Sequence, residues 1–284
     1  MNDGKVIRIE DLTLTYRGAA KPALSHIDLA VRPGQITAII GETGSGKSTL
    51  VRAALGLLTS GAETSGTIHV RAADGSDVEP LTLQRRAASA FRRRSIGYVP
   101  QLTQRALVPV LTVRRHFQQF DAKTGGGDRK DVEARAAAAL ERIGLQDPER
   151  IMGLYPHQLS GGMAQRVCIA LAMFGSARIV VADEPTSGLD VLVRRRVAEL
   201  LEVELAGADR TMLLVTHDLA LAERVATDVA VLFRGRLVES TPAGEFFAEP
   251  RHPYSRHLLA SIPLPGRELP APYDPSTFEL EAIS

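Results

Sequence analysis

The sequence predicts an α/β fold, and three observations lead to this prediction. Short, continuous apolar runs at 179–182 and 212–215 are flanked by helical patterns, which is typical of parallel strands covered on both faces. Alternating apolar and polar residues near the N-terminus indicate strands at 6–9, 12–16, 27–31 and 36–40. Residues 85–173 favour helices almost throughout. We therefore expect a β-sheet core with a block of helices inserted into it.

The remaining elements follow from the same periodicities. The sequence predicts a helix at 51–58, a strand at 66–70 and a short helix at 254–261. Within the helical block, helices are expected at 84–91, 113–120 and 132–143, and another opens after Gly162. Prolines crowd the last 35 residues, so an extended tail is expected at 263–284.

Composition narrows the range of functions. With 34 basic and 33 acidic side chains the net charge is +1, which gives no general attraction to nucleic acid. The single cysteine, Cys168, excludes an internal disulfide or a multi-cysteine metal site. The apolar runs are much shorter than the roughly 20 residues of a membrane helix, and no signal sequence is evident. We expect a cytoplasmic globular protein.

The segment Gly41–Ser48 reads G-x-x-x-x-G-K-S and lies between a predicted strand ending at Ile40 and a predicted helix. This is the pattern of a phosphate-binding loop, whose glycines let backbone N–H groups converge on a phosphate at a helix N-terminus. In such a loop Lys47 bridges the β- and γ-phosphates, and the Ser48 hydroxyl contacts Mg²⁺. The predicted ATP-binding positions here are Gly41, Glu42, Thr43, Gly44, Ser45, Gly46, Lys47, Ser48 and Thr49.

Two carboxylates end the apolar run at 179–182, at the edge of the sheet where α/β proteins bind ligands. Asp183 is expected to hold the Mg²⁺ shell, and Glu184 to orient and deprotonate the attacking water. Alone this is weak evidence, because strands commonly end at solvated acids. The phosphate loop upstream strengthens the interpretation.

A Ser-Gly-Gly turn at Ser160, Gly161 and Gly162 opens a predicted helix. Its free amides and helix N-terminus suit an anion. Because the chain has one phosphate loop, the γ-phosphate that this turn receives must come from a partner chain. The alternative is an ordinary serine N-cap followed by a glycine turn.

These motifs, in this order, resemble an ATP-binding cassette (ABC) ATPase over residues 5 to 262. The matching positions are the phosphate loop, Gln101, Leu159–Gln165, Asp183–Glu184, Ser187–Asp190 and His217. The resemblance implies an ABC-type P-loop ATPase fold: a mixed β-sheet core, an antiparallel β-flank and a helical subdomain at about 92–172. It also implies a head-to-tail dimer with an identical or related cassette, in which two ATP molecules lie between phosphate loops and opposing Ser-Gly-Gly turns.

The resemblance assigns further roles residue by residue. Tyr16 would stack on adenine, although it could instead be an ordinary edge-strand aromatic residue. Gln101 would contact Mg²⁺ and the attacking water, and His217 would contact the γ-phosphate. Asp190 would lie at the dimer seam. Catalysis is thus expected from Glu184, His217 and Gln101, and metal binding from Ser48, Gln101 and Asp183.

Within the family, the chain resembles the importers of peptides, nickel and metallophores. Tyr155–Met163 and the phrase His252-Pro253-Tyr254-Ser255 carry this similarity. Many members of that branch have a C-terminal cysteine cluster, which this chain lacks. The segment after Gln101 also lacks the branch's usual Asp-Pro start, and this segment is expected to face the membrane partner.

The predicted function is to energise an importer of a small solute from the cytoplasmic face of the inner membrane. The implied partners are integral permease subunits and, indirectly, an extracytoplasmic solute-binding protein, with no nucleic acid. The alternative is a soluble ABC ATPase in an enzyme complex such as carbon-phosphorus lyase. Cys168 is expected to be a buried small side chain, and His252 and His257 to be surface or docking residues.

Overall fold

The computed structural model describes residues 4–58, 61–101, 103–124, 128–187, 189, 191–205 and 210–262. The chain divides into two units. Unit 1 runs up to Val70 and includes Glu79–Thr82 and the chain from Leu213 onward; unit 2 comprises Arg71–Val78 and Leu83–Met212. The bounds expected for the helical subdomain, 92–172, remain a prediction, and the tail at 263–284 lies outside the described residues.

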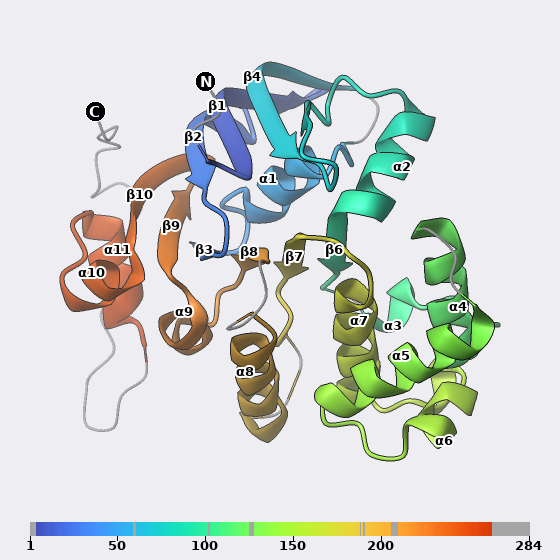
Figure 1. Ribbon diagram of the computed structural model, residues 1–284. Helices are drawn as coiled ribbons and strands as arrows, with labels where there is room; N and C mark the ends of the chain where they lie inside the picture. The colour runs from blue at the N-terminus through green and yellow to red at the C-terminus, as the bar shows by residue number, and fades with distance from the viewer. Residues whose placement is uncertain are drawn as a thin grey trace. The chain divides into compact units, whose positions relative to one another are not determined.

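Unit 1 contains an antiparallel β-flank and part of the central sheet (Figure 1). In the flank, β1 lies between β2 and β4 and is antiparallel to both. The flank strands are β1 (Ile7–Tyr16), β2 (Leu24–Val31) and β4 (Ala62–Arg71). The other strands have the order β10-β9-β3-β8 and are β3 (Ile36–Ile40), β8 (Thr211–Val215), β9 (Asp228–Phe233) and β10 (Arg236–Pro242). Strand β8 includes the unit boundary, because its first two residues belong to unit 2.

Two short sequence patterns form the single strand β1. Its buried residues include Ile9 and Leu12, which are three positions apart rather than two. The pairing register shifts between them, and Asp11 there has a positive φ of 47°. This bulge restores the inward direction of Leu12, because an extra residue changes which face the following side chains meet.

The central strands β3, β8 and β9 of unit 1 are mostly apolar, as parallel strands covered on both faces should be. Every residue of β3 is buried, and β3 is parallel to β9. Helices pack around these strands: α1 (Lys47–Ala54), α9 (Leu219–Val225), α10 (Ala243–Ala248) and α11 (Pro253–Ala260). Helices α10 and α11 lie beside β9 and β10 (Figure 1). The sequence did not predict β9 or β10.

Unit 2 has the strand order β8-β7-β6, with β6 (Ile96–Val99) parallel to β7 (Ile179–Asp183). The sequence did not predict β6, which lies within the block 85–173 that favours helices, between two of the expected helices. The helices of unit 2 are α2 (Arg85–Ser95), α3 (Thr103–Ala106), α4 (Val113–Thr124), α5 (Arg129–Arg142), α6 (Pro148–Gly153), α7 (Gly161–Phe174) and α8 (Val191–Leu205). A 3-10 turn, Pro156–Gln158, precedes α7, and a two-residue strand, β5 (Asp77–Val78), follows β4 in a hairpin.

The helices α4, α5, α6 and α7 gather in one group of unit 2, drawn from green to yellow in Figure 1. An aromatic pair supports their packing, because the rings of Phe117 and Phe174 meet edge to face with centroids 5.0 Å apart. The Arg135 guanidinium lies 4.7 Å from the centroid of the Phe174 ring. Among the described residues, no helix combines the length and apolarity needed to cross a membrane.

Candidate functional site

The predicted site residues are divided between the two units. The phosphate loop, Tyr16 and His217 belong to unit 1, whereas Gln101, the Ser160–Gly162 turn and Asp183–Glu184 belong to unit 2. Asp190 and Gly188 lie outside the described residues.

The phosphate loop connects β3 to α1, and its glycines are required by space as well as by conformation. Gly41 has φ 148°, and a Cβ atom there would lie 2.1 Å from the Leu232 carbonyl oxygen. Gly46 has φ 107° and is the N-cap of α1; a Cβ there would lie 2.9 Å from the Ala23 carbonyl oxygen. Only glycine satisfies both conditions at these two positions.

Lys47 is folded back onto its own loop. Its Nζ donates hydrogen bonds to the carbonyl oxygens of Gly41 and Glu42, each at 2.7 Å, and the residue is 6% exposed. The Ser45 N–H also donates to the Glu42 carbonyl oxygen, at 3.1 Å. The ammonium is therefore held against the backbone of its own loop, and in this motif the lysine is the side chain that reaches the phosphates.

The loop fits a phosphate in two further respects. A Cβ built on Gly44 would meet no atom within 4 Å, so the backbone there borders open space. The buried Ser45 hydroxyl has no hydrogen-bond partner among the described residues. Open backbone and a buried polar atom of this kind are consistent with an anion-binding cradle.

A contact that sequence reasoning missed lies at the start of the loop. The Glu42 N–H donates a hydrogen bond to the Tyr254 hydroxyl oxygen at 2.9 Å, from α11 near the C-terminus. His252, expected at the surface, is instead buried and is the N-cap of α11. The motif at 252–255 indicated resemblance to one branch of a protein family, but it gave no indication of the hydrogen bond between Glu42 and Tyr254.

Tyr16 lies at the end of β1 and is half-buried. Its hydroxyl donates to the Thr49 Oγ1 atom on α1 at 3.4 Å, a long hydrogen bond. The aromatic side chain is thus next to the first turn of the helix that follows the phosphate loop. His217, just after β8, is exposed and directly precedes Asp218, the N-cap of α9.

In unit 2, β7 ends at Asp183, which is buried, and Glu184 follows with a left-handed φ of 49°. This conformation is uncommon for a side chain of this kind and turns the chain sharply after the strand. The Gln101 Nε2 donates to the Glu184 Oε2 at 2.9 Å. The structure therefore brings together two predicted catalytic residues that are 83 positions apart.

Gln165, a residue of α7 that was not predicted as a site residue, supports the same region. Its side chain is 3% exposed. The Gln165 Oε1 accepts a hydrogen bond from the Thr103 hydroxyl at 2.9 Å, and its Nε2 donates to the Pro185 carbonyl oxygen at 2.5 Å. One amide thus connects the segment after Gln101 to the segment after Glu184.

The Ser-Gly-Gly turn begins α7 as predicted. Ser160 is the N-cap, and its Oγ accepts from the Met163 N–H at 3.2 Å. Ser160 and Gly161 are exposed, and a Cβ on Gly162 would lie 3.2 Å from a Val193 methyl group. Ser160 is therefore an N-cap, as the alternative interpretation expected. The N-terminus of α7 is also exposed, so its N–H groups could still bind an anion.

Cys168 is buried on α7, as expected. Its Sγ donates to the Thr103 carbonyl oxygen at 3.6 Å, and burial raises the pKa of the thiol to about 12. A neutral thiol is a poor nucleophile, so this residue has a packing role.

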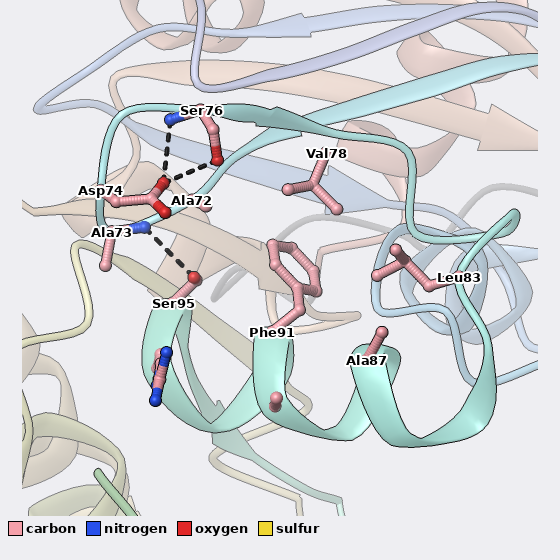
Figure 2. A pocket seen from close by; sticks show the side chains of 11 residues that line it. Ala72, Ala73, Asp74, Ser76, Val78, Leu83, Ala87, Phe91 and Ser95 are labelled. Carbon is pink, nitrogen blue, oxygen red and sulfur yellow. Dashed lines mark hydrogen bonds between the residues drawn. The ribbon is translucent and has the colours of Figure 1, made fainter. Parts of the chain in front are cut away.

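A separate cavity of about 320 Å³ lies in unit 2 between the hairpin at 72–78 and α2. Figure 2 shows Phe91 and Val78 within its apolar lining. The polar groups at its edge bond locally: Asp74 Oδ1 accepts from the N–H and hydroxyl of Ser76, and the Ala73 N–H donates to Ser95 Oγ. The two Asp74–Ser76 bonds lie within the hairpin, and the Ala73–Ser95 bond joins the hairpin to the end of α2.

An α/β fold with parallel central strands and a G-x-x-x-x-G-K-S loop between strand and helix defines a P-loop nucleoside triphosphatase. The chain matches the ABC transporter family over residues 24–187. It is 41% identical to the nickel import ATP-binding protein NikD of Rhodospirillum rubrum, over 92% of this chain and 95% of that protein. It is 34% identical to the oligopeptide transport ATP-binding protein OppD of Lactococcus lactis subsp. cremoris, over 93% of this chain and 77% of that one.

The solved structures that resemble this chain are also ABC cassettes. The dimeric ATP-binding cassette MJ0796, in a post-hydrolysis state bound to ADP and Pi, is 26% identical, with a TM-score of 0.73 over 84% of this chain and 98% of that chain. The cassette cbiO1 from Clostridium perfringens, part of the transporter complex cbiONQ, is 26% identical with the same TM-score, over 93% and 97% of the two chains. The chain belongs to the ABC transporter family, as an ATP-hydrolysing subunit of the import class. The relatives do not favour the soluble-complex alternative.

Proposed function

We propose that this chain energises the uptake of a small solute, of the peptide, nickel or metal-chelate class, by an ABC importer. The observation that carries the proposal is the phosphate loop, in which Lys47 is buried and held by two loop carbonyl groups. NikD and OppD, to which the chain is similar over most of its length, support the solute class.

The chemistry of the site residues suits Mg-ATP. The proposed metal ligands, from Ser48, Asp183 and Gln101, offer hydroxyl, carboxylate and amide oxygens, which Mg²⁺ prefers. Bound Mg²⁺ would neutralise charge on the phosphates. Lys47, whose ammonium has a third donor beyond the two bonds to its loop carbonyl groups, would contact the β- and γ-phosphates from this position, and Tyr16 would stack on the adenine.

Hydrolysis needs a base that is held in place. We assign this role to Glu184, which would take a proton from the attacking water. The hydrogen bond from Gln101 fixes one carboxylate oxygen, and the sharp turn at Glu184 sets the direction of the side chain. His217 would contact the γ-phosphate, and Gln101 would report nucleotide state to the membrane partner.

The site would be completed by a second cassette, identical or related. In a head-to-tail pair, Ser160, Gly161 and Gly162 would offer the exposed N-terminus of α7 to the partner's γ-phosphate. Asp190 would lie at the seam. ATP binding would then close the pair and hydrolysis would release it, which couples the reaction to alternating access in permease subunits.

The proposed location is peripheral, at the cytoplasmic face of the inner membrane, bound to integral permease subunits. An extracytoplasmic solute-binding protein would act on the same transporter without contacting this chain. Purification of the tagged chain from its native membrane should recover integral membrane proteins together with ATPase activity. Recovery in a membrane-free enzyme complex would contradict the transport assignment.

The nucleotide site is tested by Lys47→Ala. We expect Mg-ATP affinity, measured by isothermal titration calorimetry, to fall by about 100-fold, because charge-assisted hydrogen bonds to the phosphates are lost. The control, Lys123→Ala, changes an exposed lysine of α4 and should leave affinity unchanged. Wild-type affinity in Lys47→Ala would overturn the assignment.

A further inference from the structure

A hydrogen bond joins the C-terminal helix to the first peptide of the phosphate loop. Tyr254, in α11, accepts it through its hydroxyl oxygen from the Glu42 N–H, 212 positions earlier in the chain. Both residues belong to unit 1. The proposed roles of the site residues do not include this contact.

The same peptide group also holds Lys47. The amide N–H of Glu42 and the carbonyl group of Gly41 belong to one planar peptide unit. Its carbonyl oxygen accepts from Lys47 Nζ at 2.7 Å, while its N–H donates to Tyr254 at 2.9 Å. A rotation of this plane would turn the N–H and the carbonyl group together. The Tyr254 hydroxyl therefore fixes the direction of the Gly41 carbonyl oxygen that accepts from Lys47.

Tyr254 is itself firmly packed. It is fully buried, and its ring centroid lies 4.3 Å from that of Phe233, at the end of β9. It belongs to a buried cluster that includes Ile40, the residue before the loop, and Phe246 of α10. The hydroxyl is therefore presented by a side chain with little freedom to move.

Hydrogen bonds at the N-terminus of α11 set the position of Tyr254. The His252 Nδ1 accepts from the Tyr254 N–H at 3.1 Å. The Glu239 carboxylate, on β10 and 3% exposed, accepts from the N–H groups of Arg251 and His252, each at 2.9 Å. A buried carboxylate so bonded anchors the helix start, because charge-assisted hydrogen bonds are strong in a buried setting.

We propose that Tyr254 is a positioning residue for the phosphate loop, through which the C-terminal helix sets the affinity for ATP. This inference rests on the proposed nucleotide site. The tyrosine holds the 41–42 peptide in the orientation in which its carbonyl oxygen accepts from Lys47 Nζ. A loss of this bond lets the peptide rotate before nucleotide binds, and binding must then restore its order.

The test is Tyr254→Phe, which removes the hydroxyl and keeps the ring. We expect the Kd for Mg-ATP and the KM for ATP to rise about three- to tenfold, the effect of one hydrogen bond. The kcat at saturating ATP should stay unchanged, because the bound phosphates then hold Lys47 themselves. The matched control is Ser255→Ala, which removes the neighbouring fully buried hydroxyl; that hydroxyl has no hydrogen-bond partner among the described residues.

Thermal unfolding separates positioning from packing. Both variants can lower Tm, because both change buried side chains. We expect only Tyr254→Phe to raise the Kd for ATP, whereas Ser255→Ala keeps the wild-type Kd. Equal Kd values for Tyr254→Phe and wild type, or equal increases in both variants, would overturn the proposal. If wild type binds ATP in a Lys47-dependent manner while Tyr254→Phe is unchanged, only this inference fails. If wild type does not bind ATP, the proposed function fails first.

Discussion

The phosphate loop and the region around Glu184 carry equally important predicted residues but are built in different ways. The loop is one continuous segment whose backbone geometry demands glycine at Gly41 and Gly46. The Glu184 region is assembled by side-chain hydrogen bonds of Gln101 and Gln165 to groups that are 83, 62 and 20 positions away in the chain. Backbone constraints in a short segment produce a recognisable sequence motif. Side-chain hydrogen bonds between distant residues produce only isolated polar residues in the sequence.

If backbone geometry constrains the phosphate loop, Gly41→Ala should have the largest effect among the substitutions of these two regions. The new Cβ would collide with the Leu232 carbonyl oxygen at 2.1 Å, and φ 148° is strained for alanine. We expect a loss of about 3 kcal/mol or more in the free energy of unfolding, together with loss of ATP binding.

The control for that variant is Gly75→Ala in the hairpin of unit 2. It has φ 84° but no atom within 4 Å of the added Cβ, so it isolates the conformational cost, about 1–2 kcal/mol. Urea denaturation of both variants gives the difference. Equal losses would show that the backbone collision at Gly41 does not constrain the loop.

A smaller effect is expected from Gln165→Leu. This change leaves the Thr103 hydroxyl and the Pro185 carbonyl group without the buried amide, at a cost of about 1–3 kcal/mol in the free energy of unfolding. Because Pro185 follows Glu184, kcat should also fall about tenfold or more as the base loses its position, while the Kd for ATP is retained.

Gln118→Leu is the matched control for Gln165→Leu. Gln118 is half-buried on α4 and donates one hydrogen bond, to Glu133 at 2.9 Å. We expect a change of under about 0.5 kcal/mol and normal turnover. If the two leucine variants behave alike, Gln165 has no special role near Glu184.

Much of the fold could be predicted from the sequence, and the exceptions have physical reasons. The fully buried strands β7 and β8 appear as apolar runs, because their side chains are covered on both faces. Strand β6 was missed because it is four residues long and directly follows α2. Strand β1 looked like two runs because a bulge interrupts its alternation.

In the candidate site, motif order led to Gln101 and the carboxylates at the end of an apolar run led to Glu184, but no local pattern indicated that their side chains are bonded. Gln165 and Tyr254 were missed as site residues for a related reason. Their partners are a distant threonine, a proline carbonyl group and a backbone amide, none of which leaves a signature in sequence.

We propose that two cassettes share ATP and that Glu184 is the base for its hydrolysis. The most direct measurement uses Glu184→Gln, in analytical ultracentrifugation with and without Mg-ATP. We predict that ATP binding persists, that turnover falls by about 100-fold or more because the base is lost, and that ATP converts the variant into a stable dimer. A variant that turns over ATP at the wild-type rate, or that binds ATP and stays monomeric at every concentration, would contradict the account.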